Sequence, residues 1–487
     1  MTDITEIHYA SATAQAREIA TGNIGAEELL DHYLARIDRY NGDVNAVIWQ
    51  DEKGARKRAR EADAARLRGD ILGPLHGVPM TIKESYDFVG SPSTWGNPAW
   101  RENFPAQNAV AVQRLLDAGA NIFGKTNVPF MLADWQSFND IYGTTNNPWD
   151  LARIPGGSSG GSAAALAAGL TGMEAGSDIG ASIRNPAHYC GVFGHKPSYG
   201  IIPGIGQRPP GIVAESDIAV LGPLARSAFD LELALDIMAG PTQPKNAAWK
   251  LQLAPARHRH LKDFRVALMT AAEGFDVDDD YQAALSSLGD RLEAAGARVS
   301  REARPDIPIS DAYETYILLL RAATSTGLTE SQLERFRAIA ASAPADDKSY
   351  LTLMARAGTM PHKEWLRLHN ERMKMAQKWQ AFFEDWDILI CPAAAGPAFP
   401  HNQKGERQDR MLDINGRPQP TTDQLFWAGY SNMVDLPSTV MPVGITPSGL
   451  PVGLQAVAAY GEDRSSLRFC QLIEEAFGGF APPPGYG

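Results

Sequence analysis

Residues 155–183 read P-G-G-S-S-G-G-S-A-A-A-L-A-A-G-L-T-G-M-E-A-G-S-D-I-G-A-S-I, and the interpretation of the whole chain starts from this stretch. Gly and Ser are dense at both of its ends, and a run of small helix-forming residues lies between them. Glycine lets main-chain N–H groups approach a ligand closely, because it carries no side chain. We therefore predict two loops around one short helix, which together form a site of hydroxyl groups and backbone amides.

Four kinds of site have to be compared for such a stretch. A phosphate-binding P-loop needs a lysine after its glycines, and none follows here. The glycine spacing also differs from that of a Rossmann dinucleotide fingerprint. We recognise no nucleophile elbow of the G-x-S-x-G type at Ser158 or at Ser182, and no histidine is obviously placed to provide its base. The reading that remains is a serine hydrolase whose base is not histidine.

A lysine earlier in the chain becomes relevant to that reading. In the segment G-P-L-H-G-V-P-M-T-I-K-E-S, which begins at Gly73, the apolar residues from Val78 to Ile82 predict a buried strand. Lys83 follows this strand directly. A lysine at the inner end of a buried strand cannot place its ammonium group in water, unless the strand ends at a cleft.

Composition narrows the class of protein. The chain has 487 residues, 44% of them hydrophobic and 21% charged, which is ordinary for a soluble globular protein. The net charge of -12 argues against a nucleic-acid surface as the main function. No apolar run reaches the length of about 20 residues that a membrane-spanning helix needs. We expect neither a nucleic-acid nor a membrane partner.

Cysteine usage and the N-terminus suggest a compartment. Cys190, Cys391 and Cys470 are far apart and odd in number, which suits a reducing environment and offers no metal-ligand spacing. The first ten residues lack a charged segment followed by an apolar core, so they show no secretory signal. We expect a cytoplasmic protein without a metal or another cofactor.

The order of elements predicts an α/β protein. Helical patterns near residues 26–37, 109–118, 227–238 and 281–295 alternate with short glycine turns and apolar strand patterns. Residues from about 309 to 386 are mostly helical, and we interpret them as an insertion or cap over the sheet. The polar region 242–260 has no charge block that marks a boundary, so we expect one domain over residues 1–487.

Seven segments carry a resemblance to a known family, and they occur in that family's order. They are G-P-L-H-G-V-P-M-T-I-K-E (73–84), G-K-T-N (124–127), N-N-P-W-D (146–150), P-G-G-S-S-G-G-S (155–162), G-S-D-I-G-A-S-I-R-N-P-A (176–187), G-H-K-P-S-Y-G (194–200) and S-G-L-P-V-G-L-Q (448–455). Any one of them can arise by chance, but seven in order make the match specific. The chain resembles the amidase signature family over nearly its whole length.

The resemblance implies a fold and a catalytic triad. The fold would be a large twisted mixed β-sheet flanked by helices on both faces, with a helical insertion. Ser182 would be the nucleophile, Ser158 a bridging serine in a cis-peptide linkage, and Lys83 the base. A serine hydroxyl is a poor nucleophile until a neighbour removes its proton, and a neutral lysine can do so through a second hydroxyl. Burial must then lower the lysine pKa from about 10.4.

The same resemblance implies an oxyanion hole made of the backbone N–H groups of Ile179, Gly180, Ala181 and Ser182. Ala181 departs from the commonest family pattern, which has two glycines before the nucleophile. The added methyl group restricts the backbone and narrows the space beside the substrate carbonyl. We expect it to affect substrate fit more than the existence of catalysis.

Other polar residues near these motifs receive supporting roles. Asp178 and Arg184 flank the nucleophile, and we interpret them as structural residues that hold the loop by charge-assisted hydrogen bonds. Gln455 is interpreted as packing support. His188 and His195 stay without a role, because the family supplies a lysine base.

The substrate pocket is defined less sharply. Met131, Trp135 and Ile179 are candidate pocket walls for an apolar or aromatic substrate, and a plain core role for Met131 and Trp135 stays open. The predicted function is hydrolysis of small amides through an acyl-enzyme on Ser182. Esters and aryl carbamates are further substrates for the same chemistry, since each presents a carbonyl with a leaving group.

Two rival functions stay open. One is the glutaminase subunit of a tRNA-dependent amidotransferase, whose usual loop has Thr at the position of Ile179 and Gly at that of Ala181. The other is a non-catalytic binding protein that keeps the fold. The expected partner is a small-molecule amide, ester or carbamate. The oligomeric state stays open, with a homodimer as one alternative.

Overall fold

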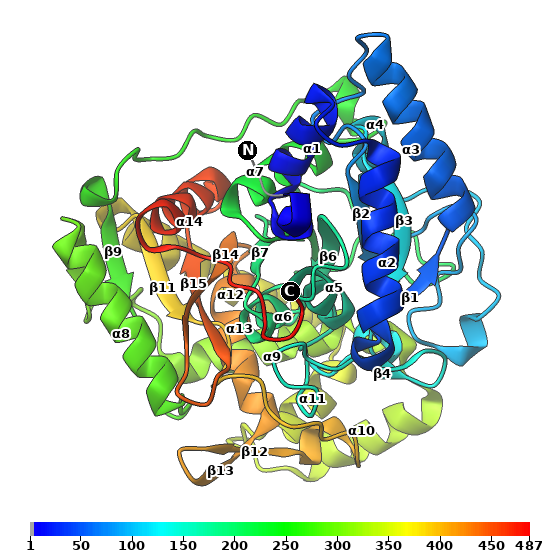
Figure 1. Ribbon diagram of the computed structural model, residues 1–487. Coiled ribbons are helices and arrows are strands. Elements are labelled where there is room, and N and C mark those ends of the chain that lie inside the picture. The colour runs from blue at the N-terminus through cyan, green and yellow to red at the C-terminus, as the bar shows by residue number, and fades with distance from the viewer. Residues whose placement is uncertain (1–3) are drawn as a thin grey trace.

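Helices and strands alternate along most of the chain in the computed structural model, which describes residues 4–487 (Figure 1). Residues 1–3 belong to the N-terminal stretch that was interpreted as lacking a secretory signal, and they lie outside the described residues. The alternation confirms the predicted α/β class.

The main sheet has eight strands. Its first three strands in spatial order pair in parallel, and all later neighbours pair antiparallel, so the sheet is mixed as expected. The spatial order is β10 (Arg298–Ser300), β9 (Arg265–Leu268), β11 (Ile388–Pro392), β15 (Pro451–Val457), β14 (Ser438–Ile445), β7 (Phe193–Lys196), β8 (Val220–Ala225) and β6 (Glu174–Asp178).

A smaller sheet delivers Lys83 to the edge of the main one. Its strands are β1 (Val47–Gln50), β3 (Asn121–Thr126) and β2 (Pro79–Lys83), in that order. Every residue of β2 is buried, and β2 lies beside β6. Lys83 is the last residue of the strand rather than the residue after it, so its main chain belongs to the rigid sheet. Two hairpins complete the strands: β4 (Phe138–Asn139) with β5 (Gly143–Thr144), and β12 (Met411–Ile414) with β13 (Arg417–Pro420).

Helices cover both faces of the main sheet. Gly194 in β7 approaches the side chains of Ile183 and Ala187, whereas the next residue, His195, contacts Asp463 on the other side. Successive residues of a strand point to opposite faces. The inner pair α5 (Gly160–Ala167) and α6 (Arg184–Cys190) therefore lies opposite the pair α7 (Ala228–Met238) and α14 (Asp463–Phe477).

The remaining helices lie around this core. They are α1 (Ala12–Thr21), α2 (Ala26–Val44) and α3 (Glu52–Leu67) at the N-terminal side, then α4 (Val110–Asp117) and α8 (Asp279–Ala294) (Figure 1).

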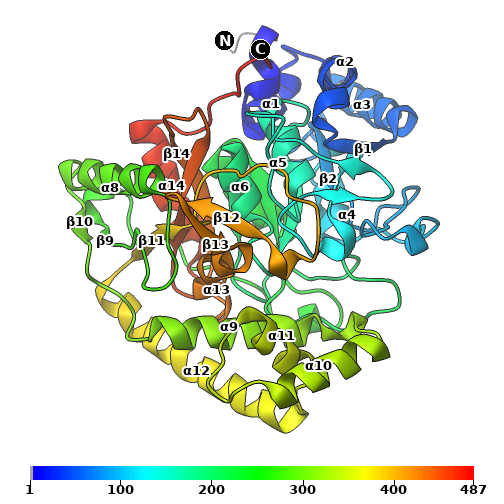
Figure 2. The ribbon, with the colours of Figure 1, turned by 90° about the horizontal axis from the view of Figure 1, so that it is seen from below.

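Four helices from the region 309–386 gather along one side of the molecule, next to α13 (Leu425–Asn432) (Figure 2). They are α9 (Ile309–Ala323), α10 (Glu330–Ser342), α11 (Tyr350–Gly358) and α12 (His362–Asp385). Helix α9 packs against α11, α12 and α13, and it is the member nearest the sheet. That this region is an insertion that caps a single domain stays a prediction.

The central stretch needs one correction. Its first loop and short helix are present, but the second segment is not a loop throughout, because residues Glu174–Asp178 form strand β6 at the edge of the main sheet. The second loop therefore begins only after Asp178. Because the loop follows directly from strand β6, its first residue is held by the sheet.

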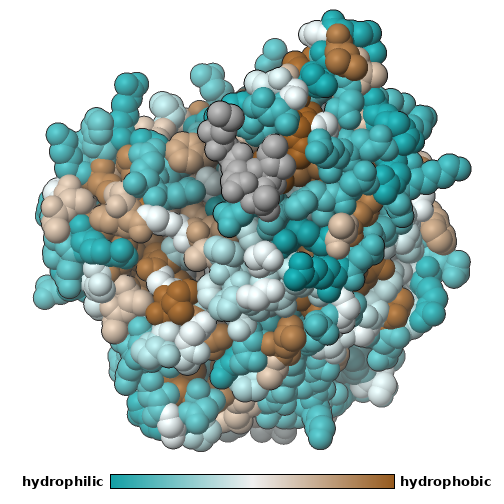
Figure 3. All heavy atoms as spheres, viewed as in Figure 1, coloured by the Kyte–Doolittle hydropathy of each residue, from teal (hydrophilic) through white to brown (hydrophobic). Residues whose placement is uncertain are grey.

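The surface agrees with the composition. The face in Figure 3 is mainly hydrophilic, and hydrophobic side chains are scattered over it. Within residues 4–487, no helix is both long and apolar enough to cross a membrane.

Substitution of Trp379 tests whether its packing stabilises the contact between α12 and α13. Its fully buried ring stacks on Phe383 at a centroid distance of 5.6 Å and meets Tyr430 of α13 at 5.0 Å. Trp379→Ala should lower the free energy of unfolding by about 3–5 kcal/mol, because it leaves a cavity between α12 and α13. Leu366→Ala, on an exposed position of the same helix, is the control and should change it by less than about 0.5 kcal/mol. Urea-induced unfolding measures both, and equal effects would contradict this packing.

Candidate active site

The lysine and the first serine of the predicted triad are in contact. Lys83 Nζ lies 2.7 Å from Ser158 Oγ and 2.9 Å from Ser177 Oγ. Lys83 is fully buried, and within residues 4–487 it makes no ion pair with a carboxylate. An unpaired lysine in a dry site is poised to lose its proton.

Burial indeed controls this lysine. It lowers the pKa of Lys83 to about 7, although the nearby carboxyl groups of Asp178 and Glu174 pull in the opposite direction. Burial also raises the pKa of Glu174 to about 8. Its carboxyl group accepts a short hydrogen bond from the hydroxyl of Thr81. At neutral pH this neighbour is therefore largely uncharged, which limits its pull on Lys83.

The two ends of the stretch 155–183 meet in space. The amide of Ser159 donates to the carbonyl oxygen of Ser182 at 3.1 Å. Asn185 clamps Gly157 from both sides: its Oδ1 accepts from the amide at 3.1 Å, and its Nδ2 donates to the carbonyl at 2.7 Å. The Gly157–Ser158 peptide bond is cis, as the resemblance implies. The loops that carry Ser158 and Ser182 are thus hydrogen-bonded to each other.

The turn before Ser182 is organised around Asp178. Its carboxylate accepts from the amides of Ala181 at 2.9 Å and Ile183 at 3.0 Å, and it forms a two-pronged ion pair with Arg184 at 3.0 and 2.9 Å. Burial alone would raise the pKa of Asp178, but Arg184 and these amides outweigh it and hold the pKa below its usual value. Ala181 adopts a left-handed conformation at φ 69°, which costs about 1–2 kcal/mol for a residue other than glycine.

Arg184 ties this turn to the far end of the chain. Its Nη1 donates to the carbonyl of Ala428 at 2.8 Å and to Gln455 Oε1 at 2.7 Å. The Nε2 of Gln455 in turn donates to the carbonyl of Pro392 at 3.1 Å. Gln455 is more than packing support: it is a buried hydrogen-bond partner of the arginine.

The amides of the turn fall into two groups. The Ala181 amide is bound to Asp178, whereas within residues 4–487 the amides of Ile179, Gly180 and Ser182 have no acceptor. Three of the four amides expected in the oxyanion hole are therefore available to a ligand. The fourth has a structural partner instead.

Each carbonyl between these amides is held from the opposite side. The Ile179 carbonyl accepts from Tyr316 and Asn432, the Gly180 carbonyl from Trp135 Nε1 at 2.7 Å, and the Ala181 carbonyl from the amide of Asn185 at 2.8 Å. The C=O and N–H of a trans peptide point in opposite directions. Fixed carbonyls therefore fix the direction of the amides.

The three candidate pocket residues lie differently. Trp135 is buried, and its indole N–H is used by the Gly180 carbonyl, so it supports the loop. Met131 is half-buried at φ 51°, and its sulfur accepts from Asn97 Nδ2 at 3.6 Å. Ile179 is half-buried in the turn itself. Met131 and Ile179 therefore keep some exposed surface, and their place in a substrate pocket stays a prediction.

The histidines have other partners. The letters G-x-S-x-G do occur from Gly156 to Gly160, but His188 bonds the main chain of Gly396 and Gly453 at 2.9 Å each, and His195 lies 3.2 Å from Asp463. Within the described part of the chain, neither ring contacts a triad serine, and no group of three His, Cys, Asp or Glu side chains is arranged as a metal site.

Several site residues were missed by the sequence reasoning. They are Ser177, which shares the ammonium of Lys83, and Asn185, Tyr316 and Asn432, which hold the two loops. Ser177 and Asn185 lie inside the motif of residues 176–187, and this position could have marked them as site residues. No motif contains Tyr316 or Asn432.

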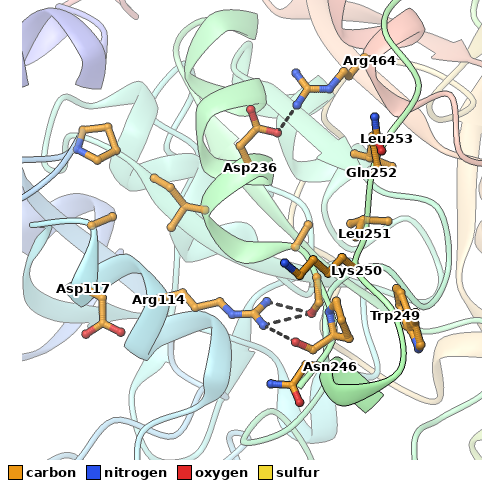
Figure 4. A pocket seen from close by; sticks show the side chains of 16 residues that line it. Arg114, Asp117, Asp236, Asn246, Trp249, Lys250, Leu251, Gln252, Leu253 and Arg464 are labelled. Carbon is orange, nitrogen blue, oxygen red and sulfur yellow. Dashed lines mark hydrogen bonds and ion pairs between the residues drawn. The ribbon is translucent and has the colours of Figure 1, made fainter. Parts of the chain in front are cut away.

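A cleft of about 900 Å³ lies elsewhere, between α4, α7 and the segment 249–253. Figure 4 shows the residues that line it. Several of its charged groups already have partners: Arg464 binds Asp236 at 2.6 Å, and Arg114 donates to the main-chain carbonyls of Gly240 and Pro241. None of the triad or turn residues lines it. This cleft is therefore separate from the contact between Lys83 and Ser158.

Comparisons with known proteins identify the family of the chain. The family model described as Amidase matches residues 28–467. The indoleacetamide hydrolase of Bradyrhizobium diazoefficiens is 32% identical, with 96% of this chain and 86% of that protein covered. A glutamyl-tRNA(Gln) amidotransferase subunit of Deinococcus deserti is 31% identical, with 95% and 96% covered. A solved bacterial aryl acylamidase of the amidase signature family has a TM-score of 0.81 over 97% of each chain, and at 21% identity it shows the fold alone.

Asp178→Asn tests the ion pair at the centre of the turn. It leaves the fully buried Arg184 without its counter-charge, so it should lower the free energy of unfolding by about 3–5 kcal/mol. Asp236→Asn is the matched control, because its exposed pair with Arg464 is worth at most about 1 kcal/mol. Urea-induced unfolding of both variants gives the comparison. A loss at position 178 no larger than that at 236 would contradict this role of Asp178.

Proposed function

The chain belongs to the amidase signature family of amide hydrolases, and we propose that it cleaves the C–N bond of small amides through an acyl-enzyme on Ser182. The observation that carries the proposal is the contact of 2.7 Å between Lys83 Nζ and Ser158 Oγ in a fully buried site. It joins a base whose pKa is lowered to about 7 with a hydroxyl that can pass a proton on.

Neutral Lys83 has one lone pair that accepts a hydrogen bond and two N–H groups that donate. The site offers a donor for the lone pair and an acceptor for an N–H group. Ser177 Oγ at 2.9 Å accepts an N–H, and Ser158 at 2.7 Å presents its hydroxyl to the lone pair. Gln207 also donates to Ser177 Oγ at 3.0 Å, which keeps that oxygen in its acceptor role. In the proposed step, Ser158 gives its proton to Lys83 and takes the proton of Ser182.

The deprotonated Oγ of Ser182 then attacks the amide carbonyl and forms a tetrahedral oxyanion. The proton returns from Lys83 through Ser158 to the leaving nitrogen, and the C–N bond breaks to leave an ester on Ser182. Water, activated by the same route, hydrolyses this ester and releases the acid. The proposed reaction uses no cofactor.

The amides of Ile179, Gly180 and Ser182 are the proposed oxyanion donors, because they have no other acceptor within residues 4–487. Such a fixed donor is typically worth about 3–4 kcal/mol in the transition state. The Ala181 amide is left out of this set, because it donates to Asp178.

For the substrate, we propose small amides, including anilides, with esters and aryl carbamates as further substrates. The half-buried Met131 and Ile179 favour an apolar group next to the carbonyl. The named activities of the relatives support amide hydrolysis in general and differ in their substrates.

The second candidate is a glutaminase subunit. Its support is the similarity to glutamyl-tRNA(Gln) amidotransferase subunits, and the residues Ile179 and Ala181 in the turn count against it. Glutamine hydrolysis that appears only when a partner chain is added would favour this candidate. Turnover of an anilide by the chain alone would favour the stand-alone amidase.

Ser182→Ala is the first test of the mechanism. Hydrolysis of a panel of aliphatic amides, anilides, esters and carbamates should fall by at least about 10⁴-fold, because the nucleophile is lost. Ser287→Ala, on the exposed face of α8, should leave the rates unchanged. Rates are measured by product release, and circular dichroism checks the fold. Unchanged turnover of the position 182 variant would eliminate the acyl-enzyme.

The pH profile tests the base. The pKa of Lys83 is lowered to about 7, and only its neutral form accepts a proton, so kcat/KM should rise with pH and level off above about 8. At pH 6 it should be roughly tenfold below the plateau, since about a tenth of the lysine is neutral there. An anilide substrate without ionisable groups gives the cleanest measurement. A flat profile from pH 6 to 8 would mean that another group, or another step, controls the rate.

A further inference from the structure

The carbonyl oxygen of Ile179 is held by two side chains from outside the loop. Tyr316 of α9 donates its hydroxyl at 2.8 Å, and Asn432 of α13 donates Nδ2 at 2.8 Å. One hydrogen bond is enough to replace the water that the buried carbonyl loses. The second donor, from another helix, therefore serves to fix the direction of the carbonyl.

Both donors are firmly placed. Tyr316 is fully buried, and its ring occupies a notch left by Gly429, where a Cβ atom would lie 2.1 Å from the ring. Burial raises the pKa of its hydroxyl, so Tyr316 stays a donor at any pH near neutrality. Asn432 also donates to the carbonyl of Ile218 at 3.1 Å, and two carbonyl acceptors fix the orientation of its amide.

The bond to the carbonyl controls the neighbouring amide. The carbonyl of Ile179 and the N–H of Gly180 belong to one peptide plane and point in opposite directions. A rotation of this plane would turn the Gly180 N–H away from the substrate, and it would break both side-chain bonds. The two donors therefore resist that rotation.

We propose that Tyr316 and Asn432 are positioning residues of the oxyanion hole, which aim the Gly180 amide by holding the Ile179 carbonyl. This inference rests on the proposed acyl-enzyme at Ser182. It makes α9 of the region 309–386 part of the catalytic apparatus, since its tyrosine reaches a turn 137 residues earlier in the chain.

Tyr316→Phe tests the proposal, because it removes one hydroxyl and keeps the ring in its notch. We expect kcat for an anilide to fall about tenfold with KM within twofold, because the oxyanion exists only in the transition state. The affinity for phenylboronic acid, which forms a tetrahedral adduct with a catalytic serine, should fall by a similar factor. The midpoint of thermal unfolding should shift by no more than about 2 °C.

Tyr313→Phe is the matched control. Tyr313 lies three residues earlier on α9, is buried like Tyr316, and within residues 4–487 its hydroxyl donates no hydrogen bond. This variant should keep kcat, KM and boronate affinity. A comparable loss in both variants would show a general effect of helix packing and overturn the proposal.

Asn432→Leu and the double variant complete the test. Each donor alone still holds the carbonyl in part, so the double variant should lose more in kcat than the product of the two single losses. Full kcat and boronate affinity in Tyr316→Phe, together with an inactive Ser182→Ala, would overturn the positioning role alone. Turnover by Ser182→Ala would instead overturn the mechanism on which it rests.

Discussion

The carboxylate of Asp178 is the constraint on which the site depends. It ends strand β6 and holds the following turn through amides on both sides of Ser182, while Arg184 neutralises it in two contacts of 3.0 and 2.9 Å. A carboxylate and a guanidinium without solvent exposure are costly to bury, and only full hydrogen bonding offsets that cost. The second branch of Arg184 binds the carbonyl of Ala428 and Gln455. One ion pair thus joins the turn before Ser182 to α13 and β15.

The same dry interior lowers the pKa of Lys83, the proposed base. Desolvation disfavours the charged form of Lys83, and a carboxylate nearby would restore it. The structure keeps the two acidic neighbours from doing so by different means. Asp178 is charged, but its ion pair with Arg184 offsets that charge. Glu174 is largely neutral, because burial raises its pKa. Lys83 is left with hydroxyl partners, Ser158 and Ser177, which solvate either of its forms.

Sequence reasoning predicted the parts of this arrangement that are local. The short helix α5 and the buried strand that ends at Lys83 follow from composition and spacing along the chain, whereas the triad was implied by the resemblance to the family. Strand β6 was missed because its residues, E-A-G-S-D, lack the β-branched and aromatic side chains typical of strands. Tyr316 was missed for another reason: at its helical spacing a tyrosine is typical of a core, and only the tertiary fold brings it to Ile179.

Ala181 shows how the turn and the oxyanion hole depend on each other. A left-handed residue here points its amide back to Asp178, and this bond helps to offset the strain of an alanine at φ 69°. The peptide planes before and after it are held by other groups, the Gly180 carbonyl by Trp135 and the Ala181 carbonyl by the amide of Asn185. The Gly180 and Ser182 amides belong to other peptide planes than the Ala181 amide, so the bond of that amide to Asp178 does not turn them away. The methyl group of Ala181 is fully buried in the core rather than exposed to a substrate. Its effect on substrate fit is therefore indirect, through the direction in which it lets the turn present Ser182.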